Sequence, residues 1–213
     1  MPSQSPPSGE SAQPTKQASA TKQPIEPQSH TAAAPASDKN SKRSAANKVI
    51  PVETLMSLQL PSLCGHQAGQ LVNGELPKNL RTAPGAAPNA NAKLVKHADG
   101  TPLGAYTDIN GDGKDEAVVA YSCVLGGVSW PERVLIYDND LNFLAEFKDW
   151  PEPHTPQRSH IRDIQWQENS VRITCAGWAK NDPAATASRQ MQADLTTNDG
   201  QPVLTVVSDQ PAR

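Results

Sequence analysis

Hydrophobic and polar positions alternate along most of the C-terminal half of the chain, with the period of two that is typical of β-strands. One segment, 116–125, is apolar on both alternating faces, which is typical of a strand buried on both sides. The pattern predicts eight strands, over 103–107, 116–125, 133–137, 142–147, 161–167, 171–178, 189–196 and 203–207.

These strands are joined by turn signals such as the Asn-Asp-Gly at 198–200. They form two four-strand meanders in succession, over 103–147 and 161–207. The sequence therefore predicts a mainly β fold, either an antiparallel sandwich or two blade-like sheets.

The region before the meanders has weaker patterning. Residues 52–60 are expected to form one short N-terminal helix, because Pro51 suits the first turn and Pro61 ends it. Residues 64–100 are rich in Gly, Pro, Asn and Ala, so we expect loops there, with short extended pieces such as 92–97.

Composition separates a tail from a domain. Residues 1–47 contain no Leu, Val, Phe, Tyr, Trp or Cys and are dominated by Ser, Ala, Pro and Gln. Such a stretch cannot bury enough apolar surface to offset its ordering entropy, so it is expected to be a disordered Ser/Pro/Ala/Gln-rich tether. The folded domain is then 48–213, which holds all the aromatic residues.

Charge narrows the classes of partner. The tail carries a net charge of +2 and the domain −5, which together make the −3 of the whole chain. This balance gives no electrostatic reason to expect nucleic acid as a partner. The acidic domain favours a cation site over a phosphate site, and no run of 18 apolar residues predicts a transmembrane segment.

The compartment can be interpreted in two ways. No basic segment followed by an apolar one opens the chain, so no signal peptide is visible, and taken literally this indicates the cytoplasm. A polar stalk before a Cys-containing domain is, however, the usual layout of an exported, tethered protein such as a lipoprotein. We therefore expect an extracellular or cell-envelope location, with a possible membrane tether upstream.

The three cysteines leave their pairing open. Cys64, Cys123 and Cys175 allow any one of three disulfides with one thiol left over. The alternative is three buried thiols, since Cys123 and Cys175 fall on the apolar faces of their strands.

The segment 108–116 carries the candidate chemistry. Oxygen-bearing side chains fall at relative positions 1, 3, 5 and 9, with a glycine at position 6 where the chain must turn sharply. Ca²⁺ takes six to eight oxygen ligands, so this spacing predicts a Ca²⁺ site. The expected ligands are the side chains of Asp108, Asn110, Asp112 and Glu116 and the carbonyl of Lys114.

This loop has two other interpretations. An EF-hand needs an acid at position 12, but that position is Val119 in the most apolar strand. A solvated turn without metal is the second alternative, because Asp, Asn and Gly favour turns whether or not a metal is bound. Against it, four carboxylates lie within nine residues, and without a cation their repulsion destabilises the fold.

The pattern Asp108-x-Asn110-Gly-Asp112-Gly113-x-x-Glu116, followed by an apolar strand, resembles the Ca²⁺ loop of FG-GAP/VCBS-type repeats. That resemblance implies side-chain ligands at positions 1, 3, 5 and 9 and a carbonyl ligand at position 7. Position 9 is usually Asp in that family and is Glu here. The match occurs once, and the chain is too short for a propeller of several such blades.

A second resemblance concerns four other segments of the sequence. Segments 63–66, 71–74, 121–123 and 126–131 are similar to small exported envelope proteins of actinobacteria, whose function is largely unknown. That resemblance implies a disulfide between Cys64 and Cys123.

The sequence favours a non-enzymatic, Ca²⁺-stabilised binding or interaction module for an unknown cell-surface or polymer ligand, with recognition on surfaces such as 126–131. An envelope hydrolase with an unrecognised site is one alternative, although no nucleophile elbow or zinc motif is present. A polysaccharide-binding module that uses Trp130, Trp150 and Trp178 is the other. His154 and His160 are expected to lie in a solvated Pro-rich loop.

Overall fold

The computed structural model describes residues 50–212, except 88–89, 127–130 and 168–169. The predicted tether, 1–47, lies outside these residues. Contacts between Cα atoms divide the chain into two units, 1–41 and 42–213, and everything described below belongs to the second.

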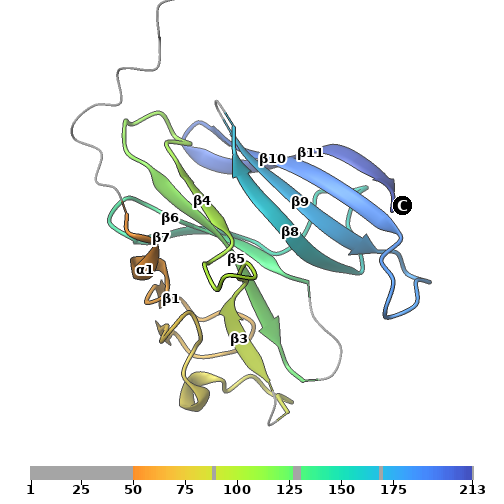
Figure 1. Ribbon diagram of the computed structural model, residues 1–213, viewed down its shortest axis with the longest axis horizontal. Coiled ribbons are helices and arrows are strands. Elements are labelled where there is room, and N and C mark those ends of the chain that lie inside the picture. The colour runs from red at the N-terminus through yellow and green to blue at the C-terminus, as the bar shows by residue number, and fades with distance from the viewer. Residues whose placement is uncertain (1–49, 88–89, 127–130, 168–169, 213) are drawn as a thin grey trace, which may run out of the picture. The chain divides into compact units, whose positions relative to one another are not determined.

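The domain is built from three antiparallel sheets (Figure 1). Two of them are the predicted meanders: β4 to β7 pair in order within a five-stranded sheet, and β8 to β11 form the four-stranded sheet. The strands of these two sheets are β3 (Asn91–Leu94), β4 (Gly104–Thr107), β5 (Glu116–Val124), β6 (Arg133–Tyr137), β7 (Phe143–Phe147), β8 (Arg158–Trp166), β9 (Val171–Trp178), β10 (Arg189–Asn198) and β11 (Gln201–Pro211). The predicted mainly β fold is therefore confirmed.

Strand β5 is the centre of the domain. Its residues from Ala117 to Tyr121 are completely buried, as the apolar pattern on both faces predicted. Val118 and Ala120 belong to the core shared with the four-stranded sheet, whereas Val119 and Tyr121 belong to a second core with the N-terminal segment. Figure 1 shows β5 with the blue four-stranded sheet on one side and the orange and yellow N-terminal segment on the other.

Inward-facing residues on the four-stranded sheet follow the predicted alternation. On β9, Val171, Ile173 and Cys175 are fully buried, and on β10, Met191 and Leu195 are too. The hairpin between β10 and β11 turns through Asp199 and Gly200, which both have positive φ, as a tight hairpin turn requires.

The predicted disulfide is present between Cys64 and Cys123, with a Cα–Cα separation of 6.5 Å, and Cys175 is a buried free thiol. The bridge ties the N-terminal segment to the end of β5. It closes a long covalent loop around the second core.

The predicted N-terminal helix is wrong in extent. Helix α1 covers only Val52–Leu55, and the residues expected to continue it instead form β1 (Gln59–Leu60), which pairs with β2 (Gly69–Gln70). Leu58 and Leu60, two positions apart, are both buried, so packing in an extended conformation overrides the weak helical pattern. The 3-10 turn η1 (Lys78–Leu80) follows β2.

Strand β8 begins at Arg158, three residues before the predicted start. Arg158 pairs with Trp178 of β9, and His160 pairs with Ala176. His160 is thus in a strand rather than in the solvated loop that the Pro-rich pattern predicted.

Candidate functional site

The predicted Ca²⁺ loop connects β4 to β5 and reverses the chain within nine residues. Thr107 and Glu116, at the two ends of the loop, are directly paired across the strands. Gly111 and Gly113 have φ of 78° and 85°, a region where other residues are strained. The two glycines therefore allow the loop to fold back on its own side chains.

The carboxylate of Asp108 organises this loop. Its Oδ1 accepts hydrogen bonds from the backbone N–H of Gly111 at 2.6 Å and of Asp112 at 3.1 Å, and its Oδ2 accepts one from Gly113 at 2.8 Å. Asn110 and Asp112 each accept a hydrogen bond from the backbone two residues further on, both at 2.8 Å. These bonds are the turn chemistry expected of Asp and Asn.

Glu116 is the buried acid of the loop, with 1% of its surface exposed. One carboxylate oxygen accepts a hydrogen bond from the Ile109 N–H and the other from the Asn110 side-chain amide, both at 2.9 Å. Burial, followed by the charges of Asp112 and Asp108, raises the pKa of Glu116 to about 7, although the Ile109 hydrogen bond opposes this. The hydrogen bonds thus suit an ionised carboxylate, while the burial and neighbouring charges disfavour it.

Two other hairpins hold the loop in place. The Thr197 hydroxyl of β10 donates a 2.6 Å hydrogen bond to the Ile109 carbonyl, and the Asn139 amide, from the turn after β6, donates one of 3.2 Å to the Asp115 carbonyl. The position of the loop therefore depends on both sheets.

The structure brings the side chains of four predicted ligands into one hydrogen-bonded network: Asp108, Asn110, Asp112 and Glu116. Lys114 contributes its N–H to Asp112, and its side chain is exposed. Within the described ranges, no three His, Cys, Asp or Glu side chains are grouped closely enough to hold a metal ion. The donor set fits Ca²⁺ by chemistry, and Asp112 is exposed, so its side chain can rotate without disturbing the core.

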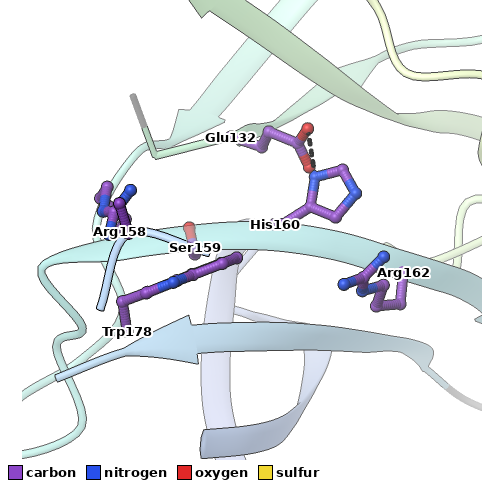
Figure 2. A pocket seen from close by; sticks show the side chains of 7 residues that line it. Glu132, Arg158, Ser159, His160, Arg162 and Trp178 are labelled. Atoms are coloured by element: carbon purple, nitrogen blue, oxygen red, sulfur yellow. Dashed lines mark hydrogen bonds and ion pairs between the residues drawn. The ribbon is translucent and has the colours of Figure 1, made fainter. Parts of the chain in front are cut away.

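A second region was not predicted from the sequence. It is a hollow of about 280 Å³ that opens between β8 and the segment before β6. Figure 2 shows Glu132 and His160 facing each other above β8, with Arg158 and Arg162 on either side.

Glu132 joins the two sheets at this hollow. Only 9% exposed, it accepts a hydrogen bond from the Ile161 N–H at 2.6 Å and contacts Nδ1 of His160 at 2.7 Å. Its own N–H donates to the Ser159 carbonyl at 3.1 Å. Because β8 is an edge strand, Glu132 satisfies backbone groups that no neighbouring strand pairs with.

Basic groups line the remainder of the hollow. The guanidinium of Arg158 lies 5.1 Å from the ring centroid of Trp178, a cation–π distance. Arg162 occupies the β-bulge between Ile161 and Asp163, which places it next to the same opening. Among the described residues, neither Arg158 nor Arg162 forms an ion pair with a carboxylate within 4.0 Å.

Two buried polar atoms at the hollow have no hydrogen-bond partner among the described residues. They are the hydroxyl of Ser159, a residue that is 3% exposed, and the indole N–H of Trp178. Figure 2 shows the Ser159 hydroxyl directed from β8 into the space between Glu132 and Trp178. Buried polar groups are normally paired, so these two unsatisfied donors are an exception to be explained.

The sequence interpretation missed Glu132, Arg158, Ser159 and Arg162. They come from two segments that lie far apart in the chain and meet only through packing of the sheets. The one available signal was the nearby Trp178, which was proposed as a stacking residue.

The remaining candidates have other surroundings. Trp150 is 7% exposed and belongs to the core, so it caps the sheets rather than offering a binding face. Trp130, with most of the proposed recognition loop 126–131, lies outside the described residues. His154 contacts Asp209 of β11 at 2.8 Å.

No protein-family model, curated protein or solved structure matches the chain. Within the part of the chain that the structure covers, no helix is long and apolar enough to cross a membrane.

Proposed function

We propose that this protein is a non-enzymatic binding module of the cell envelope or extracellular space, in which a Ca²⁺ ion held by loop 108–116 stabilises the β domain. The expected ligands are those of the sequence interpretation. The observation that carries the proposal is Glu116, a buried carboxylate whose pKa is raised first by burial and then by the negative charges of Asp112 and Asp108.

A cation would remove the conflict at Glu116. Both of its oxygens accept N–H donors, which favours the carboxylate form, while desolvation and two negative charges oppose that form. A divalent ion between Glu116, Asp108 and Asp112 would reverse the sign of the local field. Because the exposed side chain of Asp112 can turn toward Glu116, ion binding requires only a local rearrangement.

The role proposed for the ion is structural. The loop contacts both neighbouring hairpins through Thr197 and Asn139, so an ion that fixes the loop also fixes the junction of the two sheets. The Cys64–Cys123 disulfide supports an oxidising compartment, where Ca²⁺ is available at millimolar concentration.

The hydrolase alternative has less support. A serine nucleophile needs a hydrogen bond to its base, and Ser159, His160 and Glu132 are close enough in space to suggest such a set. The Ser159 hydroxyl, however, has no partner among the described residues, and its successor His160 alternates to the other side of the strand. These residues therefore form a His–Glu pair without an activated serine.

Thermal unfolding of the intact protein tests the metal proposal. Ca²⁺ at about 100 times its Kd should raise the free energy of unfolding by roughly 2.7 kcal/mol relative to chelator. The Glu116→Gln variant should lose this response. Asp140→Asn, which makes the same charge change in the exposed turn after β6, should retain it. An unchanged melting curve of the wild-type protein in Ca²⁺ and in chelator would overturn the metal site.

A further inference from the structure

We propose that the hollow between β8 and the segment before β6 binds a small organic anion, one that carries a carboxylate or phosphate group and at least one hydroxyl. This inference rests on the proposed function as a binding module and names the chemistry of its ligand. It is independent of the Ca²⁺ ion.

The charge of the hollow is the first argument. Arg158 and Arg162 flank it, and its one carboxylate, Glu132, is already engaged by Ile161 and His160. The domain as a whole is acidic, and among the described residues neither guanidinium forms an ion pair with a carboxylate within 4.0 Å, although Arg158 lies near enough to Asp182 for a longer-range electrostatic interaction. Guanidinium groups bind carboxylate and phosphate oxygens through paired hydrogen bonds.

The arrangement of Arg158 is the second argument. Stacking on Trp178 holds its guanidinium at one wall, so it loses little further freedom when an anion binds. Arg162 stands at the opposite side of the opening, as Figure 2 shows. An anionic group between the two would be held from both sides.

The buried donors are the third argument. The Ser159 hydroxyl and the Trp178 indole N–H both lack partners among the described residues. Both atoms are fully buried, so a hydroxyl or ring oxygen on the ligand would satisfy them once the Ser159 and Trp178 side chains turn toward the opening, which a bare inorganic anion held by the arginines would not do. The volume, about 280 Å³, is at the lower end of the range for small-molecule sites and suits one sugar-sized unit.

A second hollow extends this region. It has a volume of about 270 Å³, shares Glu132 and His160 with the first, and is lined by Lys93 and Lys96. Its other acid, Glu75, is paired with Arg81. The excess of positive charge thus continues past the Glu132–His160 pair.

The experiment is a titration of the ¹⁵N-labelled full chain, in Ca²⁺ and separately in chelator, with glucuronate, glucose 6-phosphate and glucose. The readout is the indole N–H resonance of Trp178, assigned through its loss in Trp178→Phe. We expect saturable shifts with one or both anionic sugars and none with glucose, and the tighter anion identifies the group that is recognised.

Variants test the assignment of residues. Arg162→Gln and Arg158→Gln should each weaken binding at least about tenfold, as expected for the loss of a charged hydrogen-bonding partner. Arg172→Gln is the matched control, because Arg172 lies on the same sheet and is paired with Asp194, and it should bind like the wild type. Its retained binding would also show that the sheet tolerates loss of an arginine.

Absence of saturable shifts with both anionic sugars would overturn the inference, and so would binding that is unchanged in Arg162→Gln. If the anionic sugars do not bind while Ca²⁺ still stabilises the protein, only the anion site in the hollow is overturned. If the anions bind while chelator leaves the melting curve unchanged, the metal site falls and this inference stands.

Discussion

The acidic loop 108–116 and the hollow beside Glu132 differ in how their residues are brought together. The loop gathers its acids within nine consecutive positions, so their spacing is visible in the sequence. The hollow takes Glu132 from the segment before β6 and Arg158, Arg162 and Trp178 from the four-stranded sheet. Local chemistry can be recognised from spacing, whereas chemistry assembled across sheets becomes visible only once the packing is known.

The two regions also differ in charge. In the loop, the charges of Asp112 and Asp108 oppose ionisation of Glu116, which is the basis of the proposed cation site. In the hollow, Arg158 and Arg162 form no ion pair with a carboxylate among the described residues, which is the basis of the proposed anion site. The net charge of −5 for the domain predicts only the first, because an average over many surface residues hides a local excess of the opposite sign.

The largest expected effect tests whether both regions depend on one folded domain. The Cys64–Cys123 bridge spans 59 residues of chain, and removing a cross-link of that length should cost about 4 kcal/mol in free energy of unfolding. The double variant Cys64→Ala/Cys123→Ala should therefore unfold at a much lower denaturant concentration, measured by circular dichroism. Tryptophan fluorescence should give the same midpoint, because a domain that unfolds in one cooperative step shows the same transition by every probe.

A midpoint equal to that of the oxidised wild type would contradict the presence of the bridge. Two separate transitions in the variant would show that the two regions unfold independently.

The next effect separates the loop from the hollow through pH. In the metal-free protein the pKa of Glu116 is raised from 4.5 to about 7, so between these values the folded state keeps a proton that the unfolded chain releases. The free energy of unfolding should then fall as pH rises from 4.5 to 7, by roughly 3 kcal/mol at most. Denaturant titrations in chelator at pH 5 and pH 8 measure this loss.

Glu116→Gln is the reference for this experiment, because the difference between the two proteins removes the contributions of other groups. One of these groups is His66, whose pKa is lowered by burial. Its contribution to the free energy of unfolding therefore has the opposite sign and increases as pH rises. Saturating Ca²⁺ should abolish the difference between the two proteins in how the free energy of unfolding depends on pH. An identical pH dependence in wild type and variant would show that ionisation of Glu116 does not destabilise the folded state.

Much of the fold follows from the sequence because its cause is local. The two apolar faces of β5 identify it as the central strand, and the turn at Asp199 and Gly200 sets the register of β10 and β11. The N-terminal helix is predicted too long because the pairing of β1 with β2 is a tertiary effect. The strong signals thus lie where residues close in sequence decide the structure.

The candidate sites divide in the same way. Asp108 and Glu116 are found from their spacing, whereas the burial of Glu116 beneath the other carboxylates is a property of the packed sheets. The role of Glu132 has no local signal, because its partners Ile161 and His160 lie 28 or more residues away. The disulfide stayed ambiguous on spacing alone, and only the resemblance to envelope proteins favoured the observed pair.

A smaller effect concerns the junction at Glu132. Replacing it by Ala removes the acceptor of the buried Ile161 N–H and the partner of His160, so we expect a loss of about 2 kcal/mol in free energy of unfolding. Glu132→Gln keeps an acceptor for the N–H and should lose less. Denaturant titration measures both, and the Ca²⁺ response of each should equal that of the wild type. A Glu132→Ala variant as stable as the wild type would show that the edge of β8 does not need this cap.

The smallest expected effect tests whether the loop is coupled to the far sheet. Thr197→Val keeps the shape of the side chain and removes its hydrogen bond to the Ile109 carbonyl, so the free energy of unfolding should fall by about 1 kcal/mol. Because that bond fixes the backbone beside the N–H donor to Glu116, the affinity for Ca²⁺ should fall as well, measured by calorimetric titration. Thr196→Val, at the neighbouring position on β10, is the control and should leave the affinity unchanged. If Thr197→Val lowers the stability but not the affinity, the loop forms its site without help from β10. The loop would then be built locally, unlike the hollow, which is built by packing of the sheets. A fall in both stability and Ca²⁺ affinity would show instead that the loop also depends on contacts with residues outside its own segment.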